Sequence, residues 1–284
     1  QKPEDFDINF LFKKSSELKL ESDDFHAYDA NTLRRFIPSY NKSFDIWHSL
    51  HQFPSYAPPK GVKQILTIHD LNFLIEKNST KQIKYKKRLQ ANINRADYLT
   101  CISQFTKGMV QDHFDLKNKE ISVIHNGVET SYNQSDTKPD FVKEHKFFFS
   151  IGIFNSKKNF HSLIPLLEHF PDYKLVIAGN HETSYGAIVK EEILNAGFEN
   201  RVVLPGKISE EIKHTLYAHC EAFLFPSLAE GFGMPPIEAM MVGKPVFLSQ
   251  ETSLPEIGGK QAFYFDSFEP VSYTHLRAHE TRGN

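Results

Sequence analysis

Two glutamates in the second half of the chain, Glu230 and Glu238, flank the segment GFGMPPI, residues 231–237. The segment follows an apolar run, and prolines near a first turn favour the start of a helix. Gly231 and Gly233 let the backbone come close to a ligand. The N–H groups and dipole of a helix start favour an anion, typically by ~0.3–2 kcal/mol, which suits a diphosphate. Carboxylates are good acceptors for hydroxyls, so the two acids predict contacts to a sugar or a ribose.

A second loop with possible chemistry is GIFNSKKN, residues 152–159, which follows the apolar run at 147–151. A lysine ~4 Å from a phosphate contributes roughly 4 kcal/mol before desolvation, at an effective dielectric constant near 20. By itself, the pair Lys157 and Lys158 ahead of a helix is typical of a solvated surface. Its place after a strand, in a chain that also carries the glutamate loop, favours the binding of a diphosphate.

The first half of the chain places His69 and Asp70 directly after the strand-like run QILTI. The residue pair is a candidate for the same site, in which Asp70 either orients the imidazole or caps the next turn. His48 ends another strand and is a weaker candidate on the acceptor side, while Trp47 is expected in the core. Ser103 is expected to be the N-cap of a helix.

Apolar runs typical of strands alternate with amphipathic stretches, which predicts parallel sheets covered on both faces. In the first part we expect strands at 8–12, 44–47, 64–68, 98–102 and 122–124, and helices over 80–95 and 103–114. In the second part we expect strands at 147–151, 174–178, 202–204, 222–225, 246–248 and 262–265, and helices over 159–169, 184–196, 209–219 and 235–242. The predicted fold class is α/β, with two Rossmann-like domains facing across a cleft.

The domain boundaries follow from composition. Residues 129–146 are polar and almost free of aliphatic side chains, so they are the predicted linker between domains at 1–128 and 147–269. The stretch VSYTHLRAHET has no helix or strand periodicity, and its codons resemble a sequencing adapter. We therefore treat 270–284 as a non-native tail, with a natural polar tail as the alternative. The first domain is expected to be incomplete, because no strand and helix precede its first strand.

The glutamate loop resembles the motif of the retaining GT-B glycosyltransferases of the family-4 type, in which seven residues separate two glutamates. The resemblance implies that Glu230 contacts the transferred sugar and Glu238 the nucleotide ribose. It also implies that Lys158, six residues after Gly152, binds the donor diphosphate. Many members carry an arginine directly after that glycine, where this chain has Ile153, and Lys157 is a candidate for the missing charge.

The resemblance extends to other strand ends. It places His69 toward the donor sugar and the acceptor, and it places the nucleotide base near Lys207 and Ile208, in the loop LPGKI. The 1–128 domain is then the acceptor side, and the 147–269 domain binds the nucleotide sugar. The implied catalytic residues are His69, Lys158 and Glu230, and the implied donor-binding residues are Lys157, Lys158, Lys207, Ile208, Glu230, Gly231, Phe232, Gly233, Met234 and Glu238.

The implied function is transfer of a hexose from a nucleoside diphosphate sugar to a hydroxyl acceptor, with retention of configuration. A glycan or lipid-linked acceptor in bacterial polysaccharide synthesis is a family-based expectation. Two alternatives stay open, a non-hydrolysing sugar-nucleotide epimerase and a non-catalytic sugar-nucleotide-binding fragment. The sequence indicates no cofactor besides the donor, and no metal, because its one Asp-x-Asp pattern, residues 5–7, comes before a strand.

Composition sets further bounds. The 284 residues carry a formal net charge of −2, which gives no general attraction to nucleic acid. Two cysteines are too few for a disulfide framework, which fits a reducing, cytoplasmic location. The basic run KQIKYKKR, from Lys81 to Arg88, predicts either a solvated helix face or peripheral contact with an anionic membrane at ~1 kcal/mol per basic residue.

Overall fold

A computed structural model describes residues 7–12, 25–29, 44–76, 78–129 and 135–268. The chain forms two compact units. One comprises Gln1–Ile68, Lys77–Thr100 and Phe114–Ser122, and the other comprises His69–Glu76, Cys101–His113 and Val123–Asn284. The predicted tail at 270–284 and two residues of the Asp-x-Asp pattern, Asp5 and Phe6, lie outside the described residues. The domain boundaries and the linker drawn from composition stay predictions.

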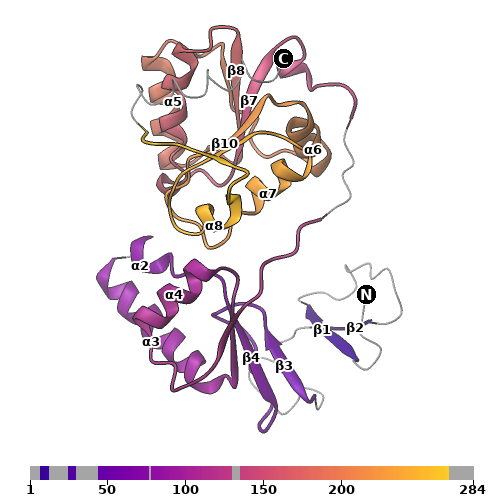
Figure 1. Ribbon diagram of the computed structural model, residues 1–284, viewed down its shortest axis with the longest axis vertical. Helices are drawn as coiled ribbons and strands as arrows, with labels where there is room; N and C mark the ends of the chain where they lie inside the picture. Colours follow the sequence, from indigo (N-terminus) through magenta and orange to yellow (C-terminus); the bar gives the residue numbers. More distant parts are fainter. Residues whose placement is uncertain (1–6, 13–24, 30–43, 77, 130–134, 269–284) are drawn as a thin grey trace. The chain divides into compact units, whose positions relative to one another are not determined.

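The first half of the chain holds two parallel sheets (Figure 1). Strands β1 (Ile8–Phe12) and β2 (Phe25–Asp29) form a pair, and β3 (Ile46–Ser49), β4 (Lys63–Ile68), β5 (Tyr98–Cys101) and β6 (Ile121–Val123) form a sheet in that order. The sequence did not predict β2, and β3 begins two residues later than predicted. Helix α3 (Ser79–Arg95) starts where the Asn78 side chain accepts a hydrogen bond from the Lys81 N–H.

The second half holds a six-stranded parallel sheet. Its strands are β7 (Lys146–Ile151), β8 (Tyr173–Ala178), β9 (Val202–Val203), β10 (Ala222–Phe225), β11 (Val246–Leu248) and β12 (Phe263–Tyr264). Their order is β12-β11-β10-β7-β8-β9, so the chain runs outward from β7 and then returns to the other side of β7. Open α/β sheets bind ligands at such a reversal, which here lies beside the loops after β7 and β10.

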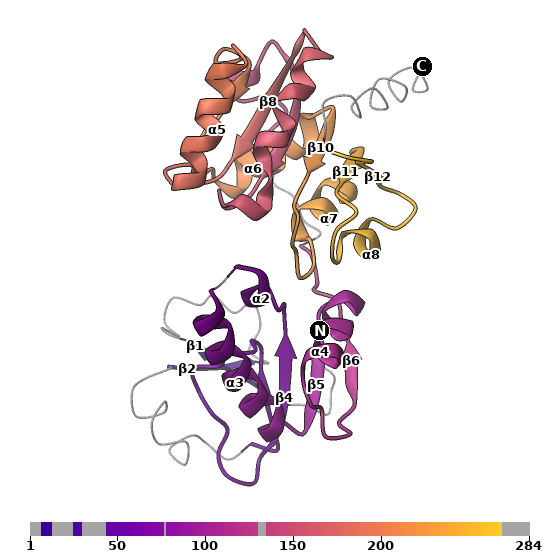
Figure 2. The same ribbon diagram turned by 90° about the vertical axis from the view of Figure 1, so that its left-hand side faces the viewer.

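Successive residues of a strand point to opposite faces of the sheet. Both faces of this sheet are buried, since residues from each face pack into a core. Phe148 packs into one core with α5 (Ser184–Asn195). Phe147 and Phe149 pack into another with α6 (Glu210–His219), α7 (Met234–Met241) and α8 (Leu254–Gly258). Figure 1 shows α5 and α6 on either side of β7 and β8, and Figure 2 shows α7 and α8 beside β10 to β12. The expected α/β class with parallel strands is confirmed.

The predicted helix over 159–169 is wrong. The chain there forms three short 3₁₀ segments, Ser156–Lys158, Phe160–Leu163 and Pro165–Glu168. Asn159 adopts a left-handed conformation with φ of 54°, which ends the first segment. Pro165 has no N–H to continue a helix from the residues before it. The apolar periodicity survives in these turns, since Phe160, Leu163 and Leu166 are fully buried.

Arg201 stabilises the turns after these segments, and its loss is expected to lower stability. Its guanidinium donates to the carbonyl groups of Leu167, Phe170 and Tyr173. Arg201→Gln would remove these hydrogen bonds from a charged donor, each worth roughly 1.5–3 kcal/mol, while the Leu167 and Phe170 carbonyls keep the N–H groups of Phe170 and Tyr173 as donors. We expect the free energy of unfolding, measured by circular dichroism in urea, to fall by roughly 2–4 kcal/mol. The control Arg88→Gln, at an exposed arginine over the Phe53 ring, should cost under about 1 kcal/mol. An equal loss of unfolding free energy in both variants would contradict the stabilising role of Arg201.

The two cysteines are free and buried. Burial raises the pKa of the Cys101 and Cys220 thiols to about 12, so both stay protonated at neutral pH. Thiolates are the reactive form, and these residues are therefore structural.

Candidate functional site

The loop after β10 reaches α7 through Gly233, whose φ of 115° is unfavourable for any residue with a side chain. Pro235 and Pro236 lie in the first turn and have no N–H. Within the described chain, the backbone N–H groups of Phe232 and Gly233 donate to no other group. The donors available to an anion at this helix start therefore lie mainly in the glycine-containing loop.

Lys158 and Glu230 meet at the reversal point of the sheet. The Lys158 Nζ lies 2.5 Å from the Glu230 Oε1, and both side chains are largely buried, with 11% and 15% exposure. Ser227, which is fully buried, donates from its Oγ to the same carboxylate oxygen at 2.5 Å. An ammonium has three N–H donors, so Lys158 keeps donors for a second anion while it holds Glu230.

Lys158 lies in the loop after β7 and contacts the end of β10. Its Nζ lies 4.6 Å from the centre of the Phe225 ring, a cation–π contact. A Cβ built on Gly152 would lie 3.0 Å from the Lys158 Cε, so the glycine leaves room for the lysine stem. The Lys157 carbonyl accepts a hydrogen bond from the Leu228 N–H at 2.7 Å, which joins the loops after β7 and β10.

Glu238 lies on α7 and makes different contacts. Its Oε1 accepts from the Lys213 Nζ at 3.2 Å, and its Oε2 accepts from the Tyr217 Oη at 2.8 Å. Lys213 also lies 2.6 Å from an exposed carboxylate, Glu210. Burial lowers the pKa of Lys213, but the hydrogen bonds and charges of Glu210 and Glu238 raise it by more. Glu238 thus accepts one hydrogen bond from a charged donor and one from a neutral donor.

Gly231 packs against the backbone that follows β4. A Cβ at this position would overlap the His69 carbonyl oxygen. The Gly231 carbonyl accepts a hydrogen bond from the Ser103 Oγ at 2.8 Å, and the Thr106 Oγ1 donates to the His69 carbonyl at 3.2 Å. Ser103 also accepts from the Thr106 N–H, so its predicted role as N-cap of α4 (Gln104–His113) is confirmed.

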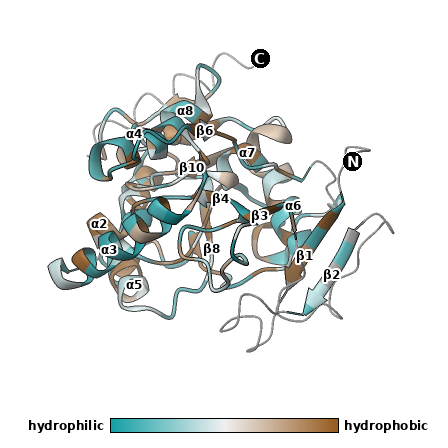
Figure 3. Ribbon diagram, turned by 90° about the horizontal axis from the view of Figure 1, so that it is seen from below, coloured by the Kyte–Doolittle hydropathy of each residue, from teal (hydrophilic) through white to brown (hydrophobic). Residues whose placement is uncertain are grey.

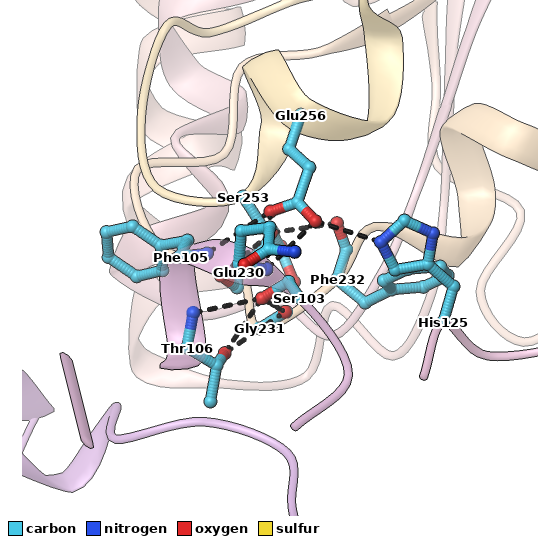
Figure 4. A network of polar contacts seen from close by, with 10 residues as sticks. Ser103, Phe105, Thr106, His125, Glu230, Gly231, Phe232, Ser253 and Glu256 are labelled. Atoms are coloured by element: carbon cyan, nitrogen blue, oxygen red, sulfur yellow. Dashed lines mark hydrogen bonds and ion pairs between the residues drawn. The ribbon is translucent and has the colours of Figure 1, made fainter. Parts of the chain in front are cut away.

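Glu256 on α8 occupies the start of α4 (Figure 4). Its carboxylate accepts from the Gln104 N–H at 2.8 and 2.9 Å and from the Phe105 N–H at 3.2 Å. It also lies 2.9 Å from the His125 Nε2. A carboxylate at a helix N-terminus is stabilised by the helix dipole. The N-terminus of α4 is therefore capped by a carboxylate, whereas no side chain caps the N-terminus of α7.

The remaining predicted residues are less closely linked. Lys207 is exposed and Ile208 is half-buried, in the loop between β9 and α6, and no contact joins them to Lys158 or Glu230 among the described residues. Asp70 accepts from the Asn72 N–H at 2.9 Å, as expected of a turn cap. His48 lies 2.7 Å from the Thr67 Oγ1. The site assignments as a whole stay predictions.

Sequence reasoning missed four residues of this network: Ser227, Lys213, Tyr217 and Glu256. Lys213 and Tyr217 are four residues apart on α6 and so share one helix face, a spacing visible in the sequence. Nothing in the sequence indicates that this face meets Glu238. Glu256 appears in the sequence as an acid in the first turn of its own helix, whereas its carboxylate caps another helix.

Two family models match the chain. One, described as Glycosyl transferases group 1, matches residues 132–268, and the other, described as Glycosyltransferase Family 4, matches residues 16–132. Together they extend from residue 16 to residue 268. The chain belongs to the group 1 glycosyltransferases of the family-4 type. The resemblance to the family-4 type that was inferred from the two glutamates is thereby confirmed.

Similar curated proteins include two mannosyltransferases. The O-antigen chain mannosyltransferase RfbU of Salmonella typhimurium is 27% identical over 212 residues, which are 74% of this chain and 58% of the relative. The serotype-specific mannosyltransferase WbdA of Escherichia coli is 26% identical over 223 residues, 72% of this chain and 27% of the relative. The chain thus spans less than two thirds of the length of these relatives.

Solved structures show the same fold. The Anabaena Alr3699/HepE structure in complex with UDP and glucose matches with a TM-score of 0.68 and 20% identity, over 84% of this chain and 69% of that one. A sucrose-phosphate synthase from Thermosynechococcus elongatus matches with a TM-score of 0.67 and 17% identity, over 84% and 65%. The chain therefore has the GT-B fold of two Rossmann-like domains, as predicted.

The predicted basic run, Lys81 to Arg88, lies on α3. Lys81, Lys84, Lys87 and Arg88 are exposed, and Figure 3 shows mainly hydrophilic colour along this helix. Among the helices that the structure describes, none is long and apolar enough to cross a membrane.

Proposed function

We propose that the protein transfers a hexose from a nucleoside diphosphate sugar to a hydroxyl group of a glycan or lipid-linked acceptor, with retention of configuration. The observation that carries the proposal is the contact between Lys158 and Glu230 beside the start of α7. A cation, unpaired loop amides and a carboxylate there suit a diphosphate joined to a sugar. The names of the similar mannosyltransferases favour mannose as the hexose and a surface polysaccharide as the product.

The chemistry follows from charge. The glycosidic bond to the diphosphate breaks as negative charge builds on the leaving phosphate oxygens. Lys158 and the N–H groups of Phe232 and Gly233 would stabilise that charge, as fixed donors do at other reacting centres. Glu230 would hold the sugar hydroxyls, and Glu238 the ribose. Catalysis would then depend on positioning and electrostatics.

Retention needs no covalent sugar intermediate in this scheme. The departing phosphate accepts the proton of the acceptor hydroxyl. The hydroxyl oxygen bonds to the anomeric carbon from the face that the diphosphate leaves. His69 is proposed to face the sugar and the acceptor. No cofactor and no metal are proposed, and the described residues contain no group of three or more His, Cys, Asp or Glu side chains that could hold a metal ion. A cytoplasmic location and membrane contact through Lys81–Arg88 stay predictions.

The test is incubation with UDP- and GDP-hexoses, with and without an oligosaccharide acceptor, in buffer and in EDTA. We expect a new glycoside only when donor and acceptor are both present, unchanged by EDTA, with the anomeric configuration of the donor by NMR. A sugar nucleotide isomerised without acceptor would instead show an epimerase. Binding of donor with neither product would show a sugar-nucleotide-binding protein.

A further inference from the structure

Glu230 and Glu238 are held by different partners. The partners of Glu238 lie on α6, outside the segment 230–238. Both of its carboxylate oxygens receive a hydrogen bond from α6, one from Lys213 and one from Tyr217. These residues are one helical turn apart and project from the same face. A side chain fixed at both oxygens has its plane as well as its position defined.

Tyr217 is a rigid support for this contact. Its side chain is fully buried, and its ring packs against Phe149 at 5.1 Å and Phe223 at 5.2 Å between ring centres. These rings belong to β7 and β10, the strands whose loops carry Lys158 and Glu230. The hydroxyl that holds Glu238 is therefore positioned by the same core as the proposed diphosphate site.

The contacts leave Glu238 able to bind a ligand. A carboxylate has about four lone-pair positions, and Lys213 and Tyr217 occupy two of them. The Glu238 side chain keeps 16% of its surface exposed. Two acceptor positions with a fixed separation suit two neighbouring hydroxyls on one ring.

We infer that Lys213 and Tyr217 are positioning residues that make Glu238 selective for a ribonucleotide over its deoxy analogues. The inference rests on the proposed function, which supplies the nucleoside diphosphate. A buried acceptor that is built to receive a hydroxyl disfavours a ligand that lacks one, because the acceptor is then left unpaired. If the carboxylate can turn to find another donor, that discrimination is lost.

The test compares the dissociation constants of UDP and GDP with those of their 2′-deoxy and 3′-deoxy analogues by calorimetry. The unaltered protein should prefer the ribonucleotide by about tenfold or more, the usual effect of one hydrogen bond to a charged group. Tyr217→Phe and Lys213→Met should each reduce this preference by roughly threefold or more, because the fixed donor is gone. Affinity for each deoxy analogue should fall by less than affinity for the ribonucleotide, since each analogue keeps only one of the two hydroxyls that Glu238 would bind.

Two controls separate positioning from a general structural effect. Tyr185→Phe removes another buried tyrosine hydroxyl, one that contacts His161, and should leave the preference unchanged. Glu210→Gln removes the exposed partner of Lys213 and should also leave it unchanged. A preference for ribonucleotides that both α6 variants retain, or a lack of preference in the unaltered protein, would overturn the inference alone. Failure of the unaltered protein to bind any nucleoside diphosphate would overturn the proposed function as well.

Discussion

Lys158→Met is expected to lower kcat for glycosyl transfer by about 10²–10³-fold, the usual effect of losing one fixed donor to a developing negative charge. Methionine keeps an apolar stem against Phe225 but cannot neutralise a phosphate. The variant also leaves Glu230 buried without its cation, which costs roughly 3–5 kcal/mol of stability. Activity must therefore be measured on protein that circular dichroism shows to be folded.

A double variant tests whether the buried, unpaired Glu230 accounts for the loss of stability in Lys158→Met. Combining it with Glu230→Gln removes both charges of the buried pair, and replacing both partners is often close to neutral for stability. We expect the double variant to regain stability and to stay inactive. The control Lys190→Met removes an exposed lysine that pairs with Glu182 and should leave kcat unchanged. Recovery of transfer together with stability would show that Lys158 acts only in folding.

Gly231→Ala is expected to lower kcat/KM at least about 10²-fold, as displacements near 1 Å do at reacting centres. The added Cβ would overlap the His69 carbonyl oxygen and lie 3.0 Å from the Asp70 Cβ. The loop must move away, and Glu230 is its neighbour in the chain. The hydrogen bond from Ser103 to the Gly231 carbonyl would be strained by the same movement.

Gly127→Ala is the matched control for Gly231→Ala. A Cβ at Gly127 meets no atom within 4 Å, so transfer should stay within about twofold of the unaltered protein. The transfer assay of the proposed function serves for both variants. Normal transfer by Gly231→Ala would show that the close approach to His69 has no part in activity.

The sequence predicted the second sheet well because its strands are short apolar runs between glycine and proline signals. The strands β10 and β11 have the predicted bounds, and α7 begins within one residue of its prediction, since Gly233 and two prolines mark its start. The strand β2 was not predicted. The helix expected over 159–169 was wrong because apolar periodicity does not indicate the left-handed turn at Asn159.

The candidate site could be predicted only in part. The residues at strand ends could be identified because parallel sheets place their loops at one edge. The pairing of Lys158 with Glu230 follows from the strand order, which places β7 beside β10, and no local pattern fixes that order. The contacts of Glu238 and Glu256 join residues 21 to 152 positions apart, so they depend on packing that a single sequence does not reveal.

The central claim, that a diphosphate binds between Lys158 and the start of α7, is tested most directly by a crystal structure with UDP or GDP bound. We expect a phosphate oxygen within hydrogen-bond distance, ~3 Å, of the Lys158 Nζ and of the backbone N–H groups of Phe232 or Gly233. A diphosphate bound elsewhere, with the Lys158 ammonium contacting protein groups alone, would contradict the account.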